Sequence, residues 1–251
     1  HPQLQAIADR WNTFLGKVRQ RISEIEAEGQ AGYREVLAID VVDQTAVSGV
    51  SSALRARLHG LRERLSSAWD TLDAELDKLS DDDVVDARDV GRCRGGMLVA
   101  RADFEHELEY RSEALIIHGE ADAARALEQV ALRELGAPLA CEHCGASLPR
   151  PQVPHAVNVT CPHCKAITTA TPGTASAMFF SGGGAIRLAF EAALPAWRAL
   201  KDAERHWQGL RHRGMRELAA WEAANRNYWT AFAQTRAAHT PGWGAKEIEA
   251  E

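Results

Sequence analysis

The sequence predicts a mainly α-helical protein, an elongated helical bundle or coiled-coil hairpin with a small β module inserted into it. Apolar residues recur at spacings of three and four over most of residues 1–136 and again over 176–238, which is the period of an amphipathic helix. Between these regions, residues 137–175 carry only three charged side chains, and this change of composition indicates a separate small module.

Length and composition restrict the class of protein. The chain has 251 residues, of which 45% are hydrophobic and 25% charged, with a formal net charge of -6. These values fit a globular protein of one or two domains and exclude collagen-like and disordered chains. Every apolar stretch is interrupted by charges, as Arg187, Glu191 and Arg198 interrupt the most apolar one, so we expect no membrane span and no signal peptide.

The N-terminal region is expected to begin with two long helices. The first carries the stripe Leu4, Ile7, Trp11, Phe14, Val18, Ile22 and Ile25 and should end near Gly29, with a turn and then a short strand or packed connector over residues 36–42. The second follows the caps Asp43 and Thr45 and continues to Leu79. About 35 helical residues span roughly 50 Å, which exceeds the diameter of a compact globule.

Two further helices are expected before the β module. The segment Ser80–Asp83 is a turn and N-cap signal, because its small polar side chains can accept bonds from the free amides of a new helix. A third helix should follow it, and a fourth should extend from Glu120 to Leu135 after a break at Gly119. Residues 1–136 therefore form the predicted N-terminal long-helix region.

Four of the five cysteines form two C-x-x-C pairs, Cys141/Cys144 and Cys161/Cys164, separated by 16 residues. Two such turns bring four thiolates to one ion in the tetrahedral arrangement that Zn²⁺ prefers. The segments 156–160 and 166–171 are β-prone, so each pair should lie at the end of a β-hairpin. Too few cysteines remain for a disulfide framework, which favours a reducing compartment and a cytoplasmic protein.

This pattern resembles the zinc-ribbon superfamily over roughly residues 139–171. The resemblance implies one structural Zn²⁺ with Cys141, Cys144, Cys161 and Cys164 as its ligands, and Lys165 stands where many ribbons have a second glycine. A ribbon joined to long helices also has a weaker architectural resemblance to bacterial coiled-coil zinc-ribbon adaptor proteins, although there the ribbon is commonly terminal.

Other chemistry at the four cysteines is less well supported by the residues. His143 and His163 lie inside the C-x-x-C pairs, where the sulfurs already complete the shell, so we expect them to be exposed groups near the metal rather than ligands. Iron can also occupy a four-thiolate site. A redox dithiol would require a thioredoxin-like βαβ pattern, which the sequence lacks.

The region after the ribbon is expected to return to helix. Residues 176–238 should form a helical region, broken near Pro195, that packs on the N-terminal helices, and residues 239–251 should form a flexible tail. The glycines at 182–184 lack the Lys-Ser/Thr of a phosphate-binding loop and should form a hinge. Narrow apolar stripes of this kind often pair between chains, so a homo-oligomer is consistent with the sequence.

The helices offer no convergent catalytic set. A carboxylate-bridged metal centre would need paired Glu-x-x-His motifs, which the candidate cluster Asp103, His106, Glu109 and Glu113 lacks; a second cluster comprises Asp202, His206 and His212. Both clusters are interpreted as solvated helix faces. Cys93 lies between Arg92 and Arg94 and is interpreted as a buried or incidental thiol rather than a reactive one.

Nucleic-acid binding is the alternative function. A basic strip interleaved with Trp197 and Trp207 comprises Arg198, Lys201, Arg205, Arg211, Arg213 and Arg216, and such strips can contact phosphates and bases. However, acidic residues interrupt the strip and the pI is about 6.0. The sequence therefore favours a non-enzymatic zinc-binding scaffold or adaptor with a protein partner over a nucleic-acid-binding ribbon protein, with a helical-bundle metalloenzyme less favoured still.

Overall fold

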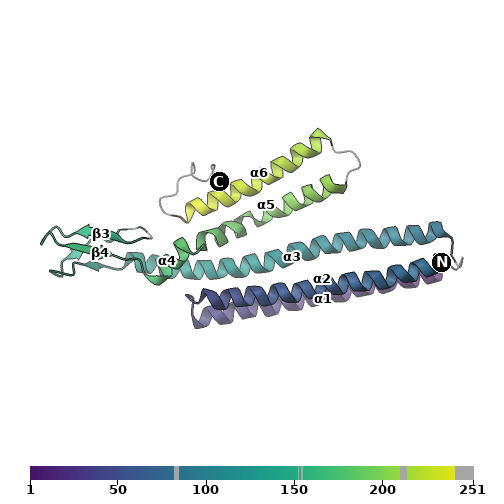
Figure 1. Cartoon of the computed structure of the whole chain (residues 1–251), viewed down its shortest axis with the longest axis horizontal. Helices are drawn as coiled ribbons and strands as arrows, with labels where there is room; N and C mark the ends of the chain where they lie inside the picture. Colours follow the sequence, from purple (N-terminus) through teal and green to yellow (C-terminus); the bar gives the residue numbers. More distant parts are fainter. Residues whose placement is uncertain (82–84, 152, 154, 210–213, 241–251) are drawn as a thin grey trace. The chain divides into compact units, whose positions relative to one another are not determined.

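The structure is a computed structural model that describes residues 1–81, 85–151, 153, 155–209 and 214–240. Three long helices come first, α1 (Pro2–Ile39), α2 (Gln44–Asp81) and α3 (Ala87–Gly136). Four short strands follow, β1 (Leu139–Ala140), β2 (Ser147–Leu148), β3 (Val157–Thr160) and β4 (Ile167–Ala170), and then the helices α4 (Thr174–Ser181), α5 (Gly184–Gly209) and α6 (Met215–Ala238). The predicted fold class, mainly α with a small β insertion, is confirmed (Figure 1).

The chain divides into two compact units. The first comprises residues 1–35 and 48–116, and the second comprises residues 36–47 and 117–251. The first unit contains most of α1 and α2 and the N-terminal part of α3. The second contains the C-terminal part of α3, the four strands and the helices α4 to α6.

The first unit is a three-helix up-down-up bundle. Ion pairs fix the directions: Arg10 of α1 pairs with Glu75 of α2, whereas Arg19 of α1 bonds Glu107 of α3 at 3.0 Å. The predicted apolar stripes form most of its core, except that Leu15 is buried where the stripe predicts Phe14, which is only partly buried. These fully buried side chains take part: Trp11, Ile22, Ile25, Leu65, Leu76, Phe104 and Leu108. Figure 1 shows α1 and α2 running side by side along their lengths.

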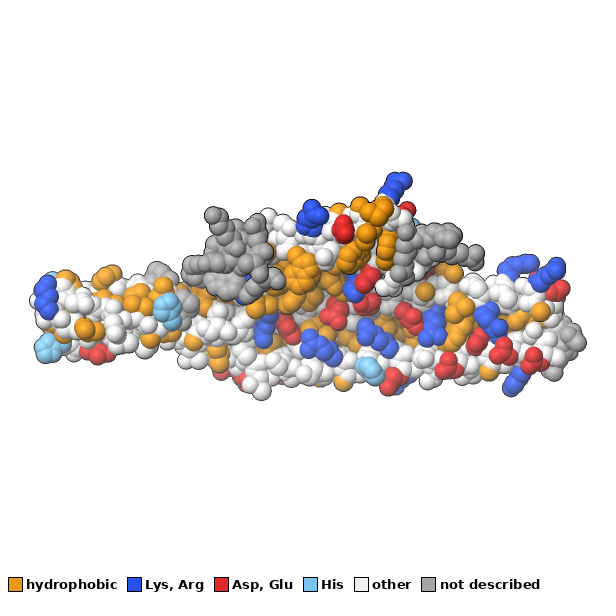
Figure 2. Space-filling model, turned by 45° about the horizontal axis from the view of Figure 1, so that its top comes forward, with side chains coloured by type: hydrophobic (Ala, Val, Ile, Leu, Met, Phe, Trp, Pro, Cys, Tyr) orange, Lys and Arg blue, Asp and Glu red, His pale blue; other side chains and the backbone are white. Residues whose placement is uncertain are grey.

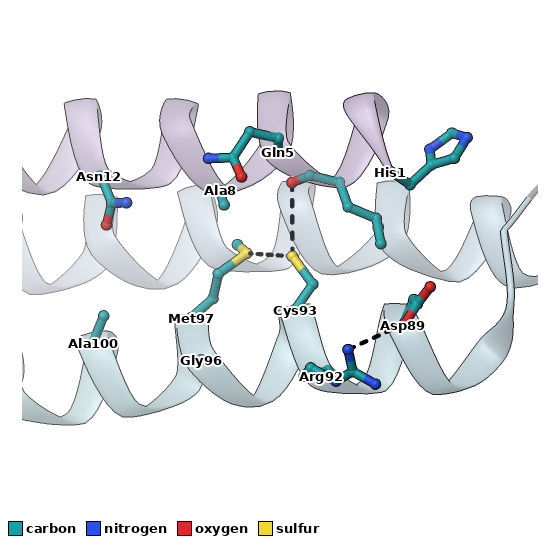
Figure 3. Close-up of a pocket in the computed structure, with 11 residues that line it drawn as sticks. His1, Gln5, Ala8, Asn12, Asp89, Arg92, Cys93, Gly96, Met97 and Ala100 are labelled. Atoms are coloured by element: carbon teal, nitrogen blue, oxygen red, sulfur yellow. Dashed lines mark hydrogen bonds and ion pairs between the residues drawn. The ribbon is translucent and has the colours of Figure 1, made fainter.

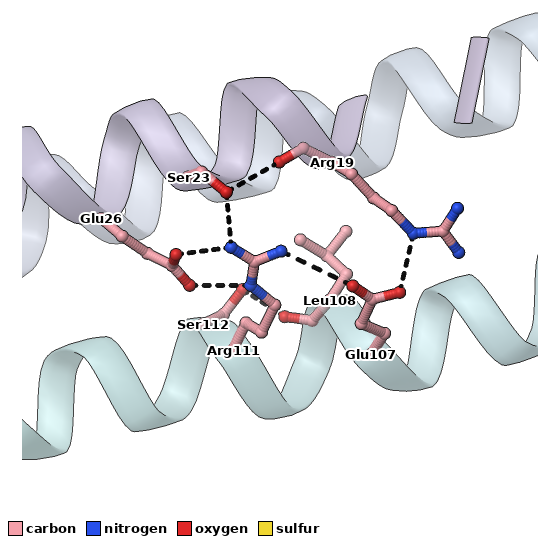
Figure 4. A network of polar contacts seen from close by, with 7 residues as sticks. All are labelled: Arg19, Ser23, Glu26, Glu107, Leu108, Arg111 and Ser112. Atoms are coloured by element: carbon pink, nitrogen blue, oxygen red, sulfur yellow. Dashed lines mark hydrogen bonds and ion pairs between the residues drawn. The ribbon is translucent and has the colours of Figure 1, made fainter. Parts of the chain in front are cut away.

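A polar network joins α1 to α3 beside this core (Figure 4). Arg111 donates through Nε to Glu26 at 2.8 Å and through its terminal nitrogen to the Ser23 hydroxyl at 2.9 Å. The Arg111 and Glu26 side chains are 23% and 27% exposed, so their charges are partly removed from water, where a paired charge is more strongly stabilised than at the surface. This network fixes the register of α1 against α3.

The helix boundaries differ from the expected ones at the start of the chain. Helix α1 continues past Gly29 to Ile39, so the expected end near Gly29 is wrong and residues 36–39 are helical rather than a strand. Gly29 is buried, and a Cβ there would lie 2.9 Å from the Leu54 side chain. The glycine therefore permits a close helix crossing within the first unit. Asp43 caps α2 as predicted, since its Oδ1 accepts from the amides of Thr45 and Ala46 at 3.0 Å.

Two other predicted breaks are absent. Helix α3 is continuous through Gly119, and α5 continues through Pro195. Proline removes one backbone bond from a helix interior, and the buried neighbours Ala193 and Leu194 hold α5 in place by packing. The cap of α3 is Asp86, whose carboxylate accepts the Arg88 amide at 2.7 Å, and part of the expected cap segment Ser80–Asp83 lies outside the described residues.

The second unit has its own helical core. It is built from the end of α3, from α4 and from the start of α5, with these buried members: Ala121, Ala124, Leu127, Ala131, Ala175, Phe179 and Leu188. Helices α5 and α6 pack against each other as a hairpin (Figure 1). The expected glycine hinge is the turn between α4 and α5, where Gly183 has a φ of 89°. Of the expected tail, residues 241–251 lie outside the described part of the chain.

Candidate metal centre

Two antiparallel hairpins carry the cysteines. Strand β1 pairs with β2 and β3 pairs with β4, with Leu139 opposite Leu148 and Thr160 opposite Ile167. Each C-x-x-C pair begins directly after the first strand of its hairpin. The sequence prediction that each pair lies at a hairpin end is confirmed.

The two cysteine turns have the same backbone geometry. The amide of Cys141 donates to the Ala146 carbonyl and the amide of Cys161 donates to the Ala166 carbonyl, both at 2.8 Å. Gly145 has a φ of 72°, and Lys165 at the equivalent position of the second turn has a φ of 63°. The turn therefore imposes left-handed backbone at this position, which a glycine adopts freely and a lysine adopts at a cost.

The four thiols converge on one point. Their sulfur atoms all lie within 4.8 Å of one another. Cys141 Sγ lies 3.6 Å from Cys164 Sγ, and Cys144 Sγ lies 3.7 Å from Cys161 Sγ. Four sulfurs at about 2.3 Å from a tetrahedral Zn²⁺ are separated by about 3.8 Å. The spacing is therefore that of a four-thiolate metal site, and it is far longer than a disulfide bond.

Backbone amides stabilise the sulfurs as anions. The amides of Cys144 and His143 donate to Cys141 and lower the pKa of its thiol to about 6. The amides of Cys164 and His163 lower the pKa of Cys161 in the same way. The Ala146 amide also lowers the pKa of the Cys144 thiol, but the neighbouring thiol of Cys164 and burial outweigh it and raise this pKa to about 12. A divalent cation bound between the four sulfurs would favour the thiolate form of all of them.

The two histidines of the turns face solvent. His143 and His163 are both exposed, and the group of side chains placed to hold an ion contains the cysteines alone. Their contribution to the site is made through their backbone amides, which point at Cys141 and Cys161. Such N–H···S bonds orient metal ligands and tune their charge.

The β module has a very small apolar core. Its buried members are Leu139, Cys141, Leu148, Cys161 and Ala170, so two of the five are themselves candidate ligands. A module of this size buries too little apolar surface to fold alone. Metal binding is the kind of interaction that supplies the missing stability in such modules.

Two residues that the sequence did not single out bring together the two ends of the β module and the two helices that flank it. Arg150 donates to the carbonyls of Ala137 at 2.9 Å and Thr171 at 3.2 Å, which lie at the two ends of the module. Glu134, near the end of α3, accepts from the Ser176 amide at 2.8 Å and the Ser176 hydroxyl at 2.9 Å at the start of α4. Neither contact has a sequence signal, because each joins groups that are distant along the chain.

The other candidate sites do not assemble. Within the described residues, the four cysteines form the one group of three or more metal-type side chains close enough to hold an ion. The cluster Asp103, His106, Glu109 and Glu113 does not form a second such group, and neither do Asp202 and His206. The third member of that last cluster, His212, lies outside the described residues.

Cys93 lies in an open pocket of the first unit, between α1 and α3 (Figure 3). Its thiol lies 3.7 Å from the Leu4 carbonyl and 3.9 Å from the Met97 sulfur. Burial raises the pKa of the Cys93 thiol. A raised pKa leaves less reactive thiolate, in agreement with the interpretation of Cys93 as an incidental thiol despite the adjacent arginines.

The basic strip is only partly described. Arg211 and Arg213 lie outside the described residues. Lys201 forms an ion pair with Glu204 at 3.2 Å and lies 5.8 Å from the centre of the Trp197 ring. Arg198 and Arg205 are exposed. Glu204, one of the acidic residues that interrupt the strip in the sequence, therefore pairs with one of its cations.

Comparisons of the chain with protein-family models, with curated proteins and with solved structures gave no match. The resemblance to zinc ribbons therefore rests on the geometry of the four cysteines. Among the described helices, none is long and apolar enough to cross a bilayer.

Proposed function

We propose that Cys141, Cys144, Cys161 and Cys164 bind one structural Zn²⁺, and that the protein is a non-enzymatic scaffold or adaptor that presents the metal-stabilised ribbon to a protein partner. The observation that carries the metal assignment is the convergence of four sulfurs within 4.8 Å. Thiolate ligands in a tetrahedral set select zinc or iron, and zinc is the more common ion in a structural site of this spacing.

A site with four protein ligands supports a structural role. The four sulfurs complete the tetrahedral shell, so the bound ion has no open position at which to activate water or substrate. Its contribution is to hold the two hairpins together and to fix the surface that they display.

The surface of the ribbon favours a protein partner over nucleic acid. Residues 137–175 carry only Arg150, Lys165 and Glu142 as charged side chains, and charged side chains are sparse on the ribbon face in Figure 2. Nucleic-acid binding depends on several phosphate contacts from cations. Ile167, by contrast, is 65% exposed on β4, and an exposed apolar side chain on a rigid strand is the type of anchor that protein partners bury.

Cobalt substitution tests the metal site. The purified chain should contain one zinc per molecule, and exchange with Co²⁺ should give the visible spectrum and sulfur-to-metal charge-transfer bands of a tetrahedral four-thiolate site. The variant C141S/C161S should lose the metal and these bands. The matched control, C93S, should retain both. A wild-type chain without thiolate-bound metal would overturn the assignment.

Affinity capture from the native cell tests the adaptor role. A protein partner that binds the wild-type chain should be lost with Ile167→Asp, which alters an exposed residue outside the metal shell, and should be retained with the exposed control Leu132→Asp. Retention of DNA or RNA at low salt that is lost with Arg198→Ala and Arg205→Ala would instead favour the nucleic-acid function.

A further inference from the structure

One outward face of α3 has a regular pattern that the bundle of the first unit does not use. Its members recur with the 3.5-residue spacing of a coiled-coil seam, and all six are exposed: Arg88, Gly91, Gly95, Leu98, Ala102 and Glu105. We call this set the α3 seam. It begins with a cation, continues with small and apolar residues, and ends with an anion.

Packing among the described residues does not require the two glycines of the seam. Gly91 and Gly95 lie inside a continuous helix, and a Cβ at either position would meet no atom within 4 Å. Neither has a positive φ. Glycine is less favourable than alanine in a helix interior, and two glycines on one face leave room for another backbone or side chain to approach it closely.

The seam also exposes apolar surface. Leu98, at the centre of the seam, is 45% exposed. The core of the bundle is already filled by Met97, Phe104 and Leu108 from the same helix, so the Leu98 side chain is additional to it. An exposed leucine beside small residues leaves an apolar surface that a second helix can cover.

We infer that the occupant of the α3 seam is the same seam of a second copy of this chain, in antiparallel orientation. In an antiparallel pair centred between Gly96 and Met97, Leu98 of one copy lies opposite Gly95 of the other. Ala102 then lies opposite Gly91, and Arg88 lies opposite Glu105. Each glycine therefore receives a larger side chain, and both ends of the interface join opposite charges.

The charge order selects this arrangement. A parallel pair in register would place Arg88 opposite Arg88 and Glu105 opposite Glu105, and like charges that face each other destabilise a helix pair. Glu105 already bonds Arg101 of its own helix at 2.8 Å, and an opposing Arg88 would add a second cation beside that carboxylate. The seam is complementary to its own antiparallel copy, which is the requirement for a two-fold symmetric dimer.

Sedimentation of the full metal-loaded chain over a range of concentrations tests this inference. The wild type should form a concentration-dependent dimer. Leu98→Asp should weaken the dimer by about 100-fold or more, because it places a charge against the partner helix. The control Leu132→Asp changes a leucine outside the seam that is at least as exposed and should leave the dimer unchanged. Circular dichroism should show unchanged helicity for both variants.

Charge exchange distinguishes the antiparallel seam from any other dimer. Arg88→Glu and Glu105→Arg should each weaken the dimer by roughly tenfold, since each variant opposes two pairs of like charges. The double variant R88E/E105R restores opposite charges in both pairs and should recover most of the wild-type affinity. A monomeric wild-type chain, a dimer insensitive to Leu98→Asp, or the absence of recovery in the double variant would overturn the inference.

Discussion

The three-helix bundle and the ribbon are stabilised in different ways. The bundle buries large side chains along its whole length, including Trp11 and Phe104 at 0% exposure, and adds the Arg111–Glu26 network between helices. The ribbon has five buried core residues, none of them aromatic, and two of these are cysteines of the candidate metal site. The bundle has many distributed contacts, whereas the ribbon has a small core and, in the proposed function, depends on one metal centre.

Because of this difference, the loss of a single interaction should affect the stability of the two regions differently. Loss of one contact in the bundle weakens a cooperative unit by a few kcal/mol at most. With the proposed zinc at the four cysteines, loss of the metal should remove the main source of stability of the ribbon at once. The predictions below test whether the two regions respond independently.

The largest effect is expected from removal of the metal. With C141S/C161S or a strong chelator, residues 139–171 should lose their protection from hydrogen exchange, since the apparent free energy of structural zinc binding is on the order of 10 kcal/mol. Far-ultraviolet circular dichroism should change little, because the helices lie outside the ribbon. Helices that unfold with the ribbon would show that the two regions are not independent.

A core truncation in the bundle should destabilise the bundle and leave the ribbon intact. Ile22 is 0% exposed, so Ile22→Ala should lower the free energy of unfolding of the bundle by about 2–5 kcal/mol. Chemical denaturation followed by circular dichroism measures this loss, and the zinc content should remain one per chain. The exposed neighbour Lys17 provides the control, since Lys17→Ala should change stability by less than about 0.5 kcal/mol.

The contact between the end of α3 and the start of α4, the helices that flank the ribbon, should depend on pH through Glu134. Burial raises the pKa of this carboxyl. The hydrogen bonds from the amide and hydroxyl of Ser176 and from the amide of Ala175 lower it by more, so the pKa of Glu134 lies below its ordinary value. A depressed folded pKa means that the stabilisation is present above the unfolded pKa of about 4.3 and is lost as the pH falls through the folded value.

Glu134→Ala measures this contribution. The variant should have a free energy of unfolding about 1 kcal/mol lower than the wild type near neutral pH, as for the loss of a helix N-cap. This difference should approach zero as the pH falls below the pKa of Glu134 in the folded protein. Thermal unfolding of the wild type and the variant from neutral to acid pH measures the difference. A cost that is independent of pH would show that the carboxylate charge does not matter.

The smallest expected effect is an increase in the stability of the ribbon. Lys165 has a φ of 63°, so Lys165→Gly should stabilise the metal-loaded ribbon by about 1 kcal/mol by relieving the left-handed backbone. The lost bond from Lys165 Nζ to the Pro162 carbonyl is exposed and should offset little of this. The same change in helical backbone, Lys17→Gly, should instead destabilise by about 1 kcal/mol. Denaturant titrations of both variants compare the signs.

The elements with a local signal were predictable. The three-four apolar spacing located the long helices, and the cysteine spacing identified the four thiols that converge. Both signals arise within short windows, where side-chain periodicity is fixed by backbone geometry. Asp43 likewise caps α2 because a cap requires only its own first turn.

Features that depend on distant partners were not predictable. Gly29 and Gly119 looked like helix ends, yet the first is a close-packing position inside α1 and the second is tolerated inside α3. Whether a glycine ends a helix depends on what packs against it, which the local sequence does not contain. The contacts of Glu134 with Ser176 and of Arg150 with Thr171 are missed for the same reason.

The Arg150 contact also bears on whether the ribbon can be replaced by another segment. Because a single guanidinium bonds both Ala137 and Thr171, the entry and exit points of the ribbon lie within reach of one side chain. A segment whose ends meet in this way can be replaced by a short loop without stretching the flanking helices. We therefore expect that the ribbon can be moved to another protein as a unit, and that other small folds with adjoining ends can be inserted at the same junction.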